Sequence, residues 1–141
     1  MVARPTLIVV SASTGDDLTA RTLPVFFDIL ERLLRAGVTT VAEAALQDKA
    51  WLPRLPPLHD LAHIRIVHAV VSQEIAWSRV LARRAQPNRR AHVETDDAAA
   101  HAAGFAAFDR LSIDVPQLEV NTRDGYDPTL AEVVALLNQP G

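Results

Sequence analysis

Apolar residues occur along this chain in two patterns, short continuous runs and longer segments in which they recur every three or four positions. The first run, Leu7 to Val10, has no polar interruption, which is typical of a strand that is buried on both faces of a sheet. Three further runs, rich in β-branched residues, predict strands at Val38 to Ala42, Ile64 to Val71 and Leu118 to Thr122. Predicted strands are therefore spread over the whole length of the chain.

Segments with helical spacing separate the predicted strands. The clearest runs from about Leu23 to Ala36, with Thr22 as the expected N-cap, Pro24 in the first turn and Gly37 just past the end. Further helices are predicted at about Leu58 to Ala62, Gln73 to Ala85, Asp96 to Phe108 and, with Asp127 as the cap, Pro128 to Leu137. Strands that alternate with helices predict an α/β fold, in which helices cover both faces of a parallel sheet.

Length and composition restrict the classes of protein to which the chain can belong. Its 141 residues carry no internal repeat and no linker, so we expect a single domain over residues 1–141. No apolar stretch is long enough to span a membrane, no signal-peptide pattern opens the chain and cysteine is absent, which together favour the cytoplasm and no membrane partner. A formal net charge of −3 argues against nucleic acid as a partner.

The turn after the first predicted strand, Ser11 to Asp17, stands where nucleotide-binding α/β proteins carry their phosphate loop. That loop needs glycines that let backbone N–H groups wrap the phosphates, a lysine for the outer phosphates and a hydroxyl for magnesium. The turn contains Gly15 alone, and the only lysine of the chain is Lys49. The phosphate-loop pattern is therefore missing from the place where it is expected.

Several other stretches nevertheless follow one another in the order and spacing of a known family; they are Arg21 to Phe27, Gly37 to Ala45, Ala82 to Arg84, Arg89 to His92, and Asp124 to Pro128. Pro5 to Ser11 is similar to the first strand of that family. On these stretches the chain resembles the small P-loop NTPases and kinases that include chloramphenicol phosphotransferase and zeta-toxin-like proteins, with an AAA-type ATP-binding domain. The resemblance implies a three-layer, P-loop-kinase-like sandwich, ATP and Mg²⁺ as cofactors, and phosphoryl transfer to a small-molecule hydroxyl.

The chain departs from this family between the first strand and the first long helix. In the family, that strand leads into the phosphate loop, its helix and a substrate-binding segment, and only then into the helix that Arg21 introduces here. In this chain the strand passes almost directly to Gly15 to Thr19, as if an internal segment that includes Walker A had been removed. We therefore expect a truncated, degenerate member of a kinase lineage that is impaired in catalysis, because nothing else replaces the loop.

Arginine supplies almost all the basic residues, and one stretch without acidic residues contains Arg79, Arg83, Arg84, Arg89 and Arg90. By resemblance this stretch is the kinase lid, whose arginines neutralise the charge of the transferring phosphoryl group. The resemblance assigns a catalytic role to Arg83 and Arg84, and cofactor binding to Arg79, Arg89 and Arg90. The alternative is a solvated, charged helix face followed by a loop.

Two strand ends supply the remaining candidates. Glu43 ends the second predicted strand, at the carboxyl edge where α/β sheets bind ligands, and by resemblance it faces the phosphates as a catalytic residue. Asn121 and Thr122 end the fourth strand, where by resemblance they bind the adenine of ATP. The alternatives are a solvated carboxylate for Glu43 and ordinary turn chemistry from Asp124 to Pro128. No metal site is predicted, because the histidines lack a third ligand at a recognisable spacing.

Two other functions stay open beside an impaired kinase. One is a non-catalytic domain that binds a nucleotide or a phosphorylated small molecule through the arginines. The other is a truncated product without a selected function. Without the helix of the missing segment, apolar side chains of the first strand would be left partly bare, so we also expect marginal stability or self-association.

Overall fold

The computed structural model describes residues 4–11, 17–45, 47–84 and 97–139 of the chain. In this part of the chain, four parallel strands form one sheet in the order β2-β1-β3-β4; they are β1 (Thr6–Ser11), β2 (Thr40–Ala44), β3 (His63–Val70) and β4 (Gln117–Asn121). Each strand overlaps one that the apolar runs predict. The parallel α/β sheet is therefore confirmed, and β2 and β4 are its two edges.

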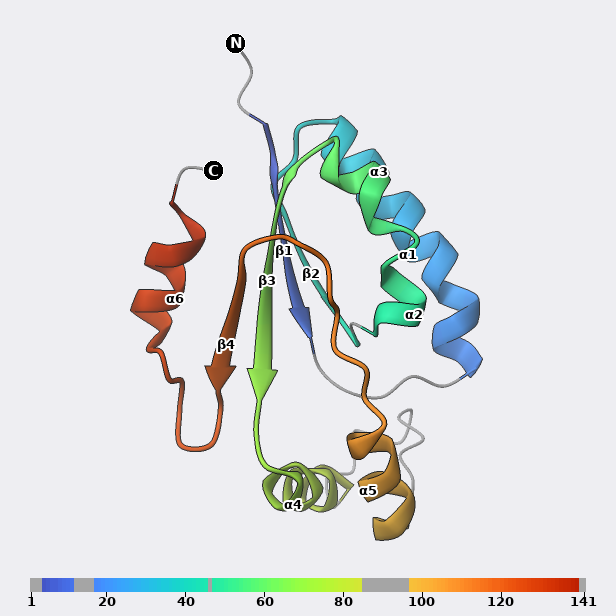
Figure 1. Ribbon diagram of the computed structural model, residues 1–141, viewed down its shortest axis with the longest axis vertical. Coiled ribbons are helices and arrows are strands. Elements are labelled where there is room, and N and C mark those ends of the chain that lie inside the picture. The colour runs from blue at the N-terminus through green and yellow to red at the C-terminus, as the bar shows by residue number, and fades with distance from the viewer. Residues whose placement is uncertain (1–3, 12–16, 46, 85–96, 140–141) are drawn as a thin grey trace.

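Helices connect the strands, and the described ranges contain α1 (Asp17–Arg35), α2 (Asp48–Trp51), α3 (Leu55–His59), α4 (Gln73–Arg84), α5 (Ala98–Ala106) and α6 (Leu130–Leu137). The helices α1, α2 and α3 lie together on one side of the sheet and α6 lies on the other (Figure 1). The helices α4 and α5 lie beyond the carboxyl ends of the strands. None of these described helices is long and apolar enough to cross a membrane.

The larger core lies between the sheet and the helices α1 to α3. Leu7 of β1 and Ile66 of β3 pack in one buried cluster with Leu34 of α1. Trp51 of α2 is fully buried, and its ring meets that of Phe27 in a T-shaped contact with 4.7 Å between the ring centroids. Because fully burying a leucine, isoleucine or phenylalanine side chain contributes about 1.5–3 kcal/mol, this larger cluster stabilises the fold substantially.

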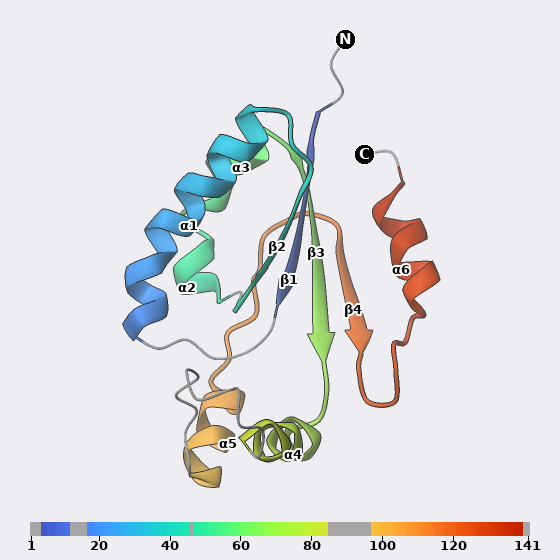
Figure 2. The same cartoon turned by 180° about the vertical axis from the view of Figure 1, so that it is seen from behind.

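The opposite face of the sheet carries a smaller core under α6. Val67 of β3 and Val120 of β4 are buried against Val133 of α6. Arg65, also buried, donates hydrogen bonds to carbonyl oxygens at the C-terminal end of α6, where a cation complements the helix dipole. Helices on both faces of the sheet give the three-layer arrangement that the sequence predicts (Figure 2).

The cover provided by α6 does not extend to β2. Val41 is the register partner of Ile8, whose half-buried side chain packs against the core under α6, so both residues face the same way. Val41 is nevertheless 65% exposed, and Glu43, two residues further along β2, is exposed as well. The face opposite α1 to α3 is therefore partly bare where β2 forms the edge of the sheet.

The connections between the first three strands break the usual rule of handedness. The chain leaves β1 for β2 through α1, and returns past β1 to β3 through α2 and α3. These helices share one buried cluster on one face, so two crossovers run in opposite directions over the same face. Since nearly all such crossovers are right-handed, one of the two is exceptional. The two views together identify the left-handed connection as β1–α1–β2 (Figures 1 and 2).

Three predicted details of the helices are wrong. The helix α1 begins at Asp17, so Thr22 and Pro24 lie inside it, and Pro24 removes one internal hydrogen bond instead of opening the first turn. Thr129, and not Asp127, caps α6, because its hydroxyl accepts from the N–H of Glu132 in a capping box. The helix predicted at Leu58 to Ala62 is placed earlier, as α3, and is preceded by the unpredicted α2.

Candidate functional site at the carboxyl edge of the sheet

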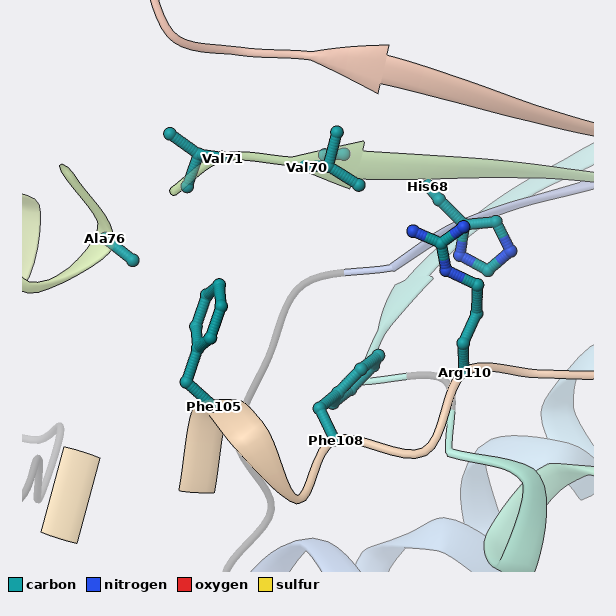
Figure 3. A pocket seen from close by; sticks show the side chains of 8 residues that line it. His68, Val70, Val71, Ala76, Phe105, Phe108 and Arg110 are labelled. Atoms are coloured by element: carbon teal, nitrogen blue, oxygen red, sulfur yellow. The ribbon is translucent and has the colours of Figure 1, made fainter. Parts of the chain in front are cut away.

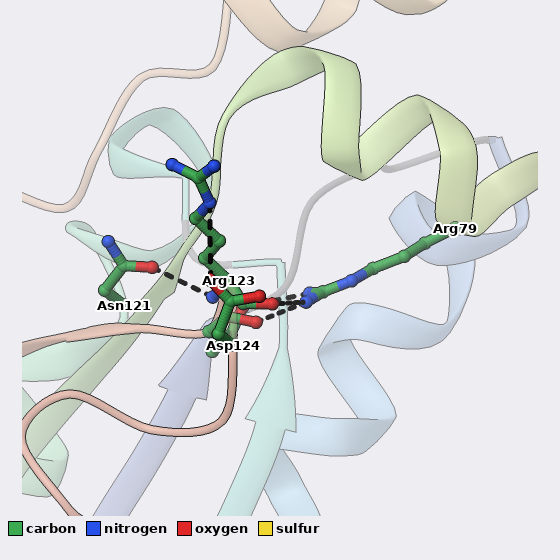
Figure 4. Close-up of polar contacts among 5 residues, drawn as sticks. Arg79, Asn121, Arg123 and Asp124 are labelled. Carbon is green, nitrogen blue, oxygen red and sulfur yellow. Dashed lines mark hydrogen bonds and ion pairs between the residues drawn. The ribbon is translucent and has the colours of Figure 1, made fainter.

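Arg79 connects α4 to the turn that follows β4. Its guanidinium group donates to the hydroxyl of Thr122 at 3.0 Å and to the backbone carbonyl oxygens of Thr122 and Arg123, the last at 3.3 Å. Figure 4 shows the side chain extended from the helix toward this turn. Because one planar fork binds three oxygens, Arg79 fixes α4 against the carboxyl edge. The guanidinium is engaged with the protein, and cofactor binding by Arg79 stays a prediction.

Asn121 and Thr122 belong to a closed turn after β4. The backbone of Asn121 exchanges two hydrogen bonds with that of Asp127, at 2.8 and 3.0 Å, and its side-chain oxygen accepts from the N–H of Arg123 at 2.9 Å. The hydroxyl of Thr122 donates to the carbonyl oxygen of Val70 in β3 at 3.2 Å. Both side chains therefore take part in the turn chemistry that was the alternative interpretation, and adenine binding stays a prediction.

The last turn of α4 carries two further predicted residues. Arg83 is exposed, and Arg84 is half-buried with its guanidinium carbon 5.8 Å from the ring centroid of Trp77, a cation–π contact. Both residues lie on the helix that is tied to the carboxyl edge. Arg89 and Arg90 lie outside the described residues.

Glu43 lies one residue before the end of β2, at the carboxyl edge where the sequence predicts it. β2 and β4 are opposite edges of the sheet, three strand spacings or roughly 14 Å apart. Thr122 also lies four residues past Leu118, the residue of β4 that is level with Glu43, so the two site residues are further apart than the strands. The structure therefore brings Arg79 and Thr122 together, and it does not bring Glu43 into that group. A catalytic role for Glu43 stays a prediction.

A cavity of about 250 Å³ lies between the end of β3 and the helices α4 and α5. Its walls are mainly apolar and include Val70, Phe105 and Phe108, whose side chains are seen around the cavity in Figure 3. Its polar lining comes from His68 of β3 and Arg110, which follows α5. Small-molecule sites combine such apolar walls with a few placed polar groups, so the cavity is a second candidate site.

Sequence reasoning did not assign His68 or Arg110 to a site. The signal for His68 is its position, since it is a histidine inside the otherwise apolar end of β3, and it is 4% exposed. Arg110 has no such signal, because neither its neighbours nor its spacing relates it to β3. Only the parallel pairing of β3 with β4 brings the two residues to one place.

Histidine and carboxylate groups do not gather into a metal site in the part of the chain that the structure describes. Asp97, which pairs with His101 in helical spacing, instead caps α5, and its carboxylate accepts from the N–H of Ala99 at 2.8 Å. Glu43 is the one predicted carboxylate at the carboxyl edge, and it stands apart from the turn after β4.

Comparisons with known proteins identify a similar fold. No family model and no curated protein matches the chain. Among solved structures, the crystal structure of "a putative kinase from Chloroflexus aurantiacus J-10-fl" matches with a TM-score of 0.64 and 18% sequence identity, over 96% of this chain and 96% of that chain. An identity this low shows the fold alone. The architecture of this chain is therefore that of a kinase-like α/β protein.

Proposed function

We propose that the chain derives from an ATP-dependent small-molecule kinase, has lost efficient phosphoryl transfer, and binds a phosphate-bearing ligand at the carboxyl edge of its sheet. The observation that carries the proposal is the position of α4, which Arg79 ties to the turn after β4 so that its arginines stay at this edge. The kinase-like fold supports the lineage. Guanidinium groups suit such a ligand, because their planar fork binds two phosphate oxygens at once.

Two features of the sheet support the loss of an internal segment after β1. The first is the left-handed crossover from β1 through α1 to β2. The second is the bare face at Val41, because a right-handed path from β1 toward β2 would pass over that face and cover it with a helix. Removal of a helix between Ser11 and Asp17 accounts for both features.

The loss of efficient phosphoryl transfer rests on residues that the chain lacks. Transfer depends on a loop, a lysine and Mg²⁺ that together position the phosphates and neutralise their charge. The only lysine, Lys49, lies in α2 and not in the turn after β1. ATP would therefore meet arginines of α4 without the groups that hold its outer phosphates and metal, which favours binding over catalysis.

Inorganic phosphate and ATP are the probes that test binding. Either one should raise the melting temperature of the parent, because it binds the folded state. The double variant Arg83→Ala/Arg84→Ala should lose most of that rise. Its ligand-free melting temperature should fall only slightly, because Arg83 is exposed and the cation–π contact of Arg84 contributes about 0.5–1 kcal/mol. The matched control is Arg32→Ala/Arg35→Ala, which removes the same charge from the last turn of α1. That turn lies at the end of the sheet where the strands begin, so this variant should keep the rise in melting temperature.

Sodium chloride at the same ionic strength controls for general screening, which would act with any salt. A double variant that responds to phosphate as the parent does would contradict binding by α4. Calorimetry with Mg²⁺-ATP tests the other half of the proposal: we expect weak binding and no turnover of ATP. Micromolar, magnesium-dependent binding would show instead that the turn from Ser11 to Asp17 still works as a phosphate loop.

A further inference from the structure

The amide of Gln117 fixes how His68 presents its ring. The Nε2 of Gln117 donates to the carbonyl oxygen of Ile113 at 2.7 Å, so its Oε1 is the atom that meets the histidine. The Nε2 of His68 lies 2.7 Å from this oxygen and must carry the proton that it donates. In the neutral ring Nδ1 is then an acceptor, and the bond to Gln117 is the one hydrogen bond of this ring that the described part of the chain shows. His68 therefore brings one hydrogen-bond acceptor to the wall of the cavity.

Arg110 brings donors to the same wall. Its Nη1 donates to the carboxylate of Glu119 at 2.9 Å, and Glu119 is the register partner of His68 across β3 and β4. The guanidinium group is thereby held beside the imidazole, and it has further N–H groups beyond the one that Glu119 accepts. The charges of Arg110 and Glu119 balance each other. The cavity therefore offers a donor next to an acceptor without a net charge.

The rest of the cavity is apolar and small. Phe105 and Phe108 supply flat aromatic walls, with Val70 and Ala76 between the helix and the strand (Figure 3). The volume of about 250 Å³ falls below the roughly 300–1,000 Å³ of sites for drug-sized ligands, so it suits a single ring with small substituents. Flat apolar surfaces favour a planar ring that can lie against them.

We propose that this cavity binds a small, neutral, planar heterocycle that carries an N–H next to a C=O, the arrangement on one edge of uracil. The N–H donates to Nδ1 of His68, the carbonyl oxygen accepts from Arg110, and the ring lies against Phe105 and Phe108. An anionic ligand is disfavoured because Glu119 already neutralises Arg110. The site uses none of the arginines of α4, so the proposal is independent of phosphate binding.

Calorimetry with uracil tests the proposal on the intact chain. Uracil should bind and release heat, whereas 1,3-dimethyluracil, which keeps the ring and the carbonyls but lacks any N–H, should bind about tenfold more weakly or not at all. The variant His68→Leu removes the Nδ1 acceptor and supplies no other, so in the folded chain it should lose the preference for uracil over the dimethyl compound. Arg110→Gln should weaken binding of uracil, and the charge control Arg54→Gln should not.

Each outcome bears on the proposal. Uridine compared with uracil shows whether a free base or a nucleoside fits, and the small volume favours the free base. Equal binding of uracil and its dimethyl derivative by the folded parent would overturn the assignment of His68, and no binding of uracil would overturn the site. Phe105→Leu, which keeps the cavity apolar, should weaken binding of both compounds. Uracil binding should survive Arg83→Ala/Arg84→Ala, so failure of either proposal can be recognised separately.

Discussion

Arg79 shows how one side chain can position a whole helix. We expect Arg79→Ala to remove its hydrogen bonds to Thr122 and Arg123 and to lower the free energy of unfolding by about 1 kcal/mol, because the side chain is exposed and water replaces the partners. The backbone amides of α4 should exchange hydrogen faster than in the parent, which mass spectrometry after deuterium labelling measures. Glu74→Gln, an exposed change on the same helix, should leave this exchange unaltered. An unaltered exchange rate in Arg79→Ala would show that the contacts of Arg79 do not hold α4 in place.

The sequence identified individual residues better than it identified their partners. Arg79 and Thr122 were both predicted as site residues, but for separate roles on a phosphate and on adenine. The structure joins them to each other, because β3 and β4 are neighbours and α4 follows β3 directly. His68 and Arg110 were not predicted as a site, since residues that are distant in sequence share a wall only after the strands pair.

The capping box at the N-terminus of α6 makes the stability of the fold depend on pH. The hydroxyl and the backbone N–H of Thr129 donate to the carboxylate of Glu132, at 2.6 and 2.8 Å, and these hydrogen bonds hold its pKa below the ordinary value of 4.5. A carboxyl group with a lowered pKa in the folded state stabilises the fold above its unfolded pKa, and this contribution is lost as the pH falls through the folded pKa.

We therefore expect Glu132→Gln to make the free energy of unfolding less sensitive to pH below 4.5 than it is in the parent. Urea denaturation at neutral pH and at several acidic pH values measures this difference. Glu74→Gln removes an exposed carboxylate that makes no capping box, and it should follow the parent. Identical pH curves for Glu132→Gln and the parent would show that the capping carboxylate does not stabilise the folded state.

The helices and strands could be predicted from the sequence where a regular pattern of apolar residues extends over many positions. The strands were predicted because their apolar runs are continuous. The end of α1 was predicted from Gly37, because glycine is typical just past the end of a helix, and the structure gives this residue a positive φ of 77°. The sequence contains the Thr-x-x-Glu pattern of a capping box at Thr129, but Asp127 was predicted as the cap instead. The short helix α2 could not be predicted, because four residues are too few to show a helical repeat of apolar positions. Its position depends on the burial of Trp51.

The bare face beside β2 predicts self-association of the whole molecule. Val41 is exposed on an edge strand whose outer backbone groups have no described partner strand, and such edges pair readily with other chains. We expect the parent to form dimers or larger species as its concentration rises, measured by sedimentation velocity. Val41→Lys should shift this equilibrium toward monomer. Val25→Lys changes a valine of similar exposure on α1, on the other side of the sheet, and should not shift it. A parent that stays monomeric at all concentrations would refute the prediction.

The alternation of strands and helices predicted the class of fold. The order of the strands and the handedness of the crossovers could not be predicted from the local sequence. The order β2-β1-β3-β4 is set by which apolar faces fit together, and each crossover would by default be expected to be right-handed. The left-handed connection through α1 therefore came from the structure alone.

The left-handed connection from β1 to α1 is a suitable place for the insertion of a designed segment. An insertion between Ser11 and Asp17 would start beside the bare face and end at the first turn of α1, and the outer edge of β2 can pair with one more parallel strand. A designed helix-and-strand unit of suitable length could cover Val41, extend the sheet by one strand and replace the left-handed connection by right-handed ones. Chimeras built in this way should gain stability as they gain length, whereas insertion into most parallel sheets interrupts a connection that is already complete.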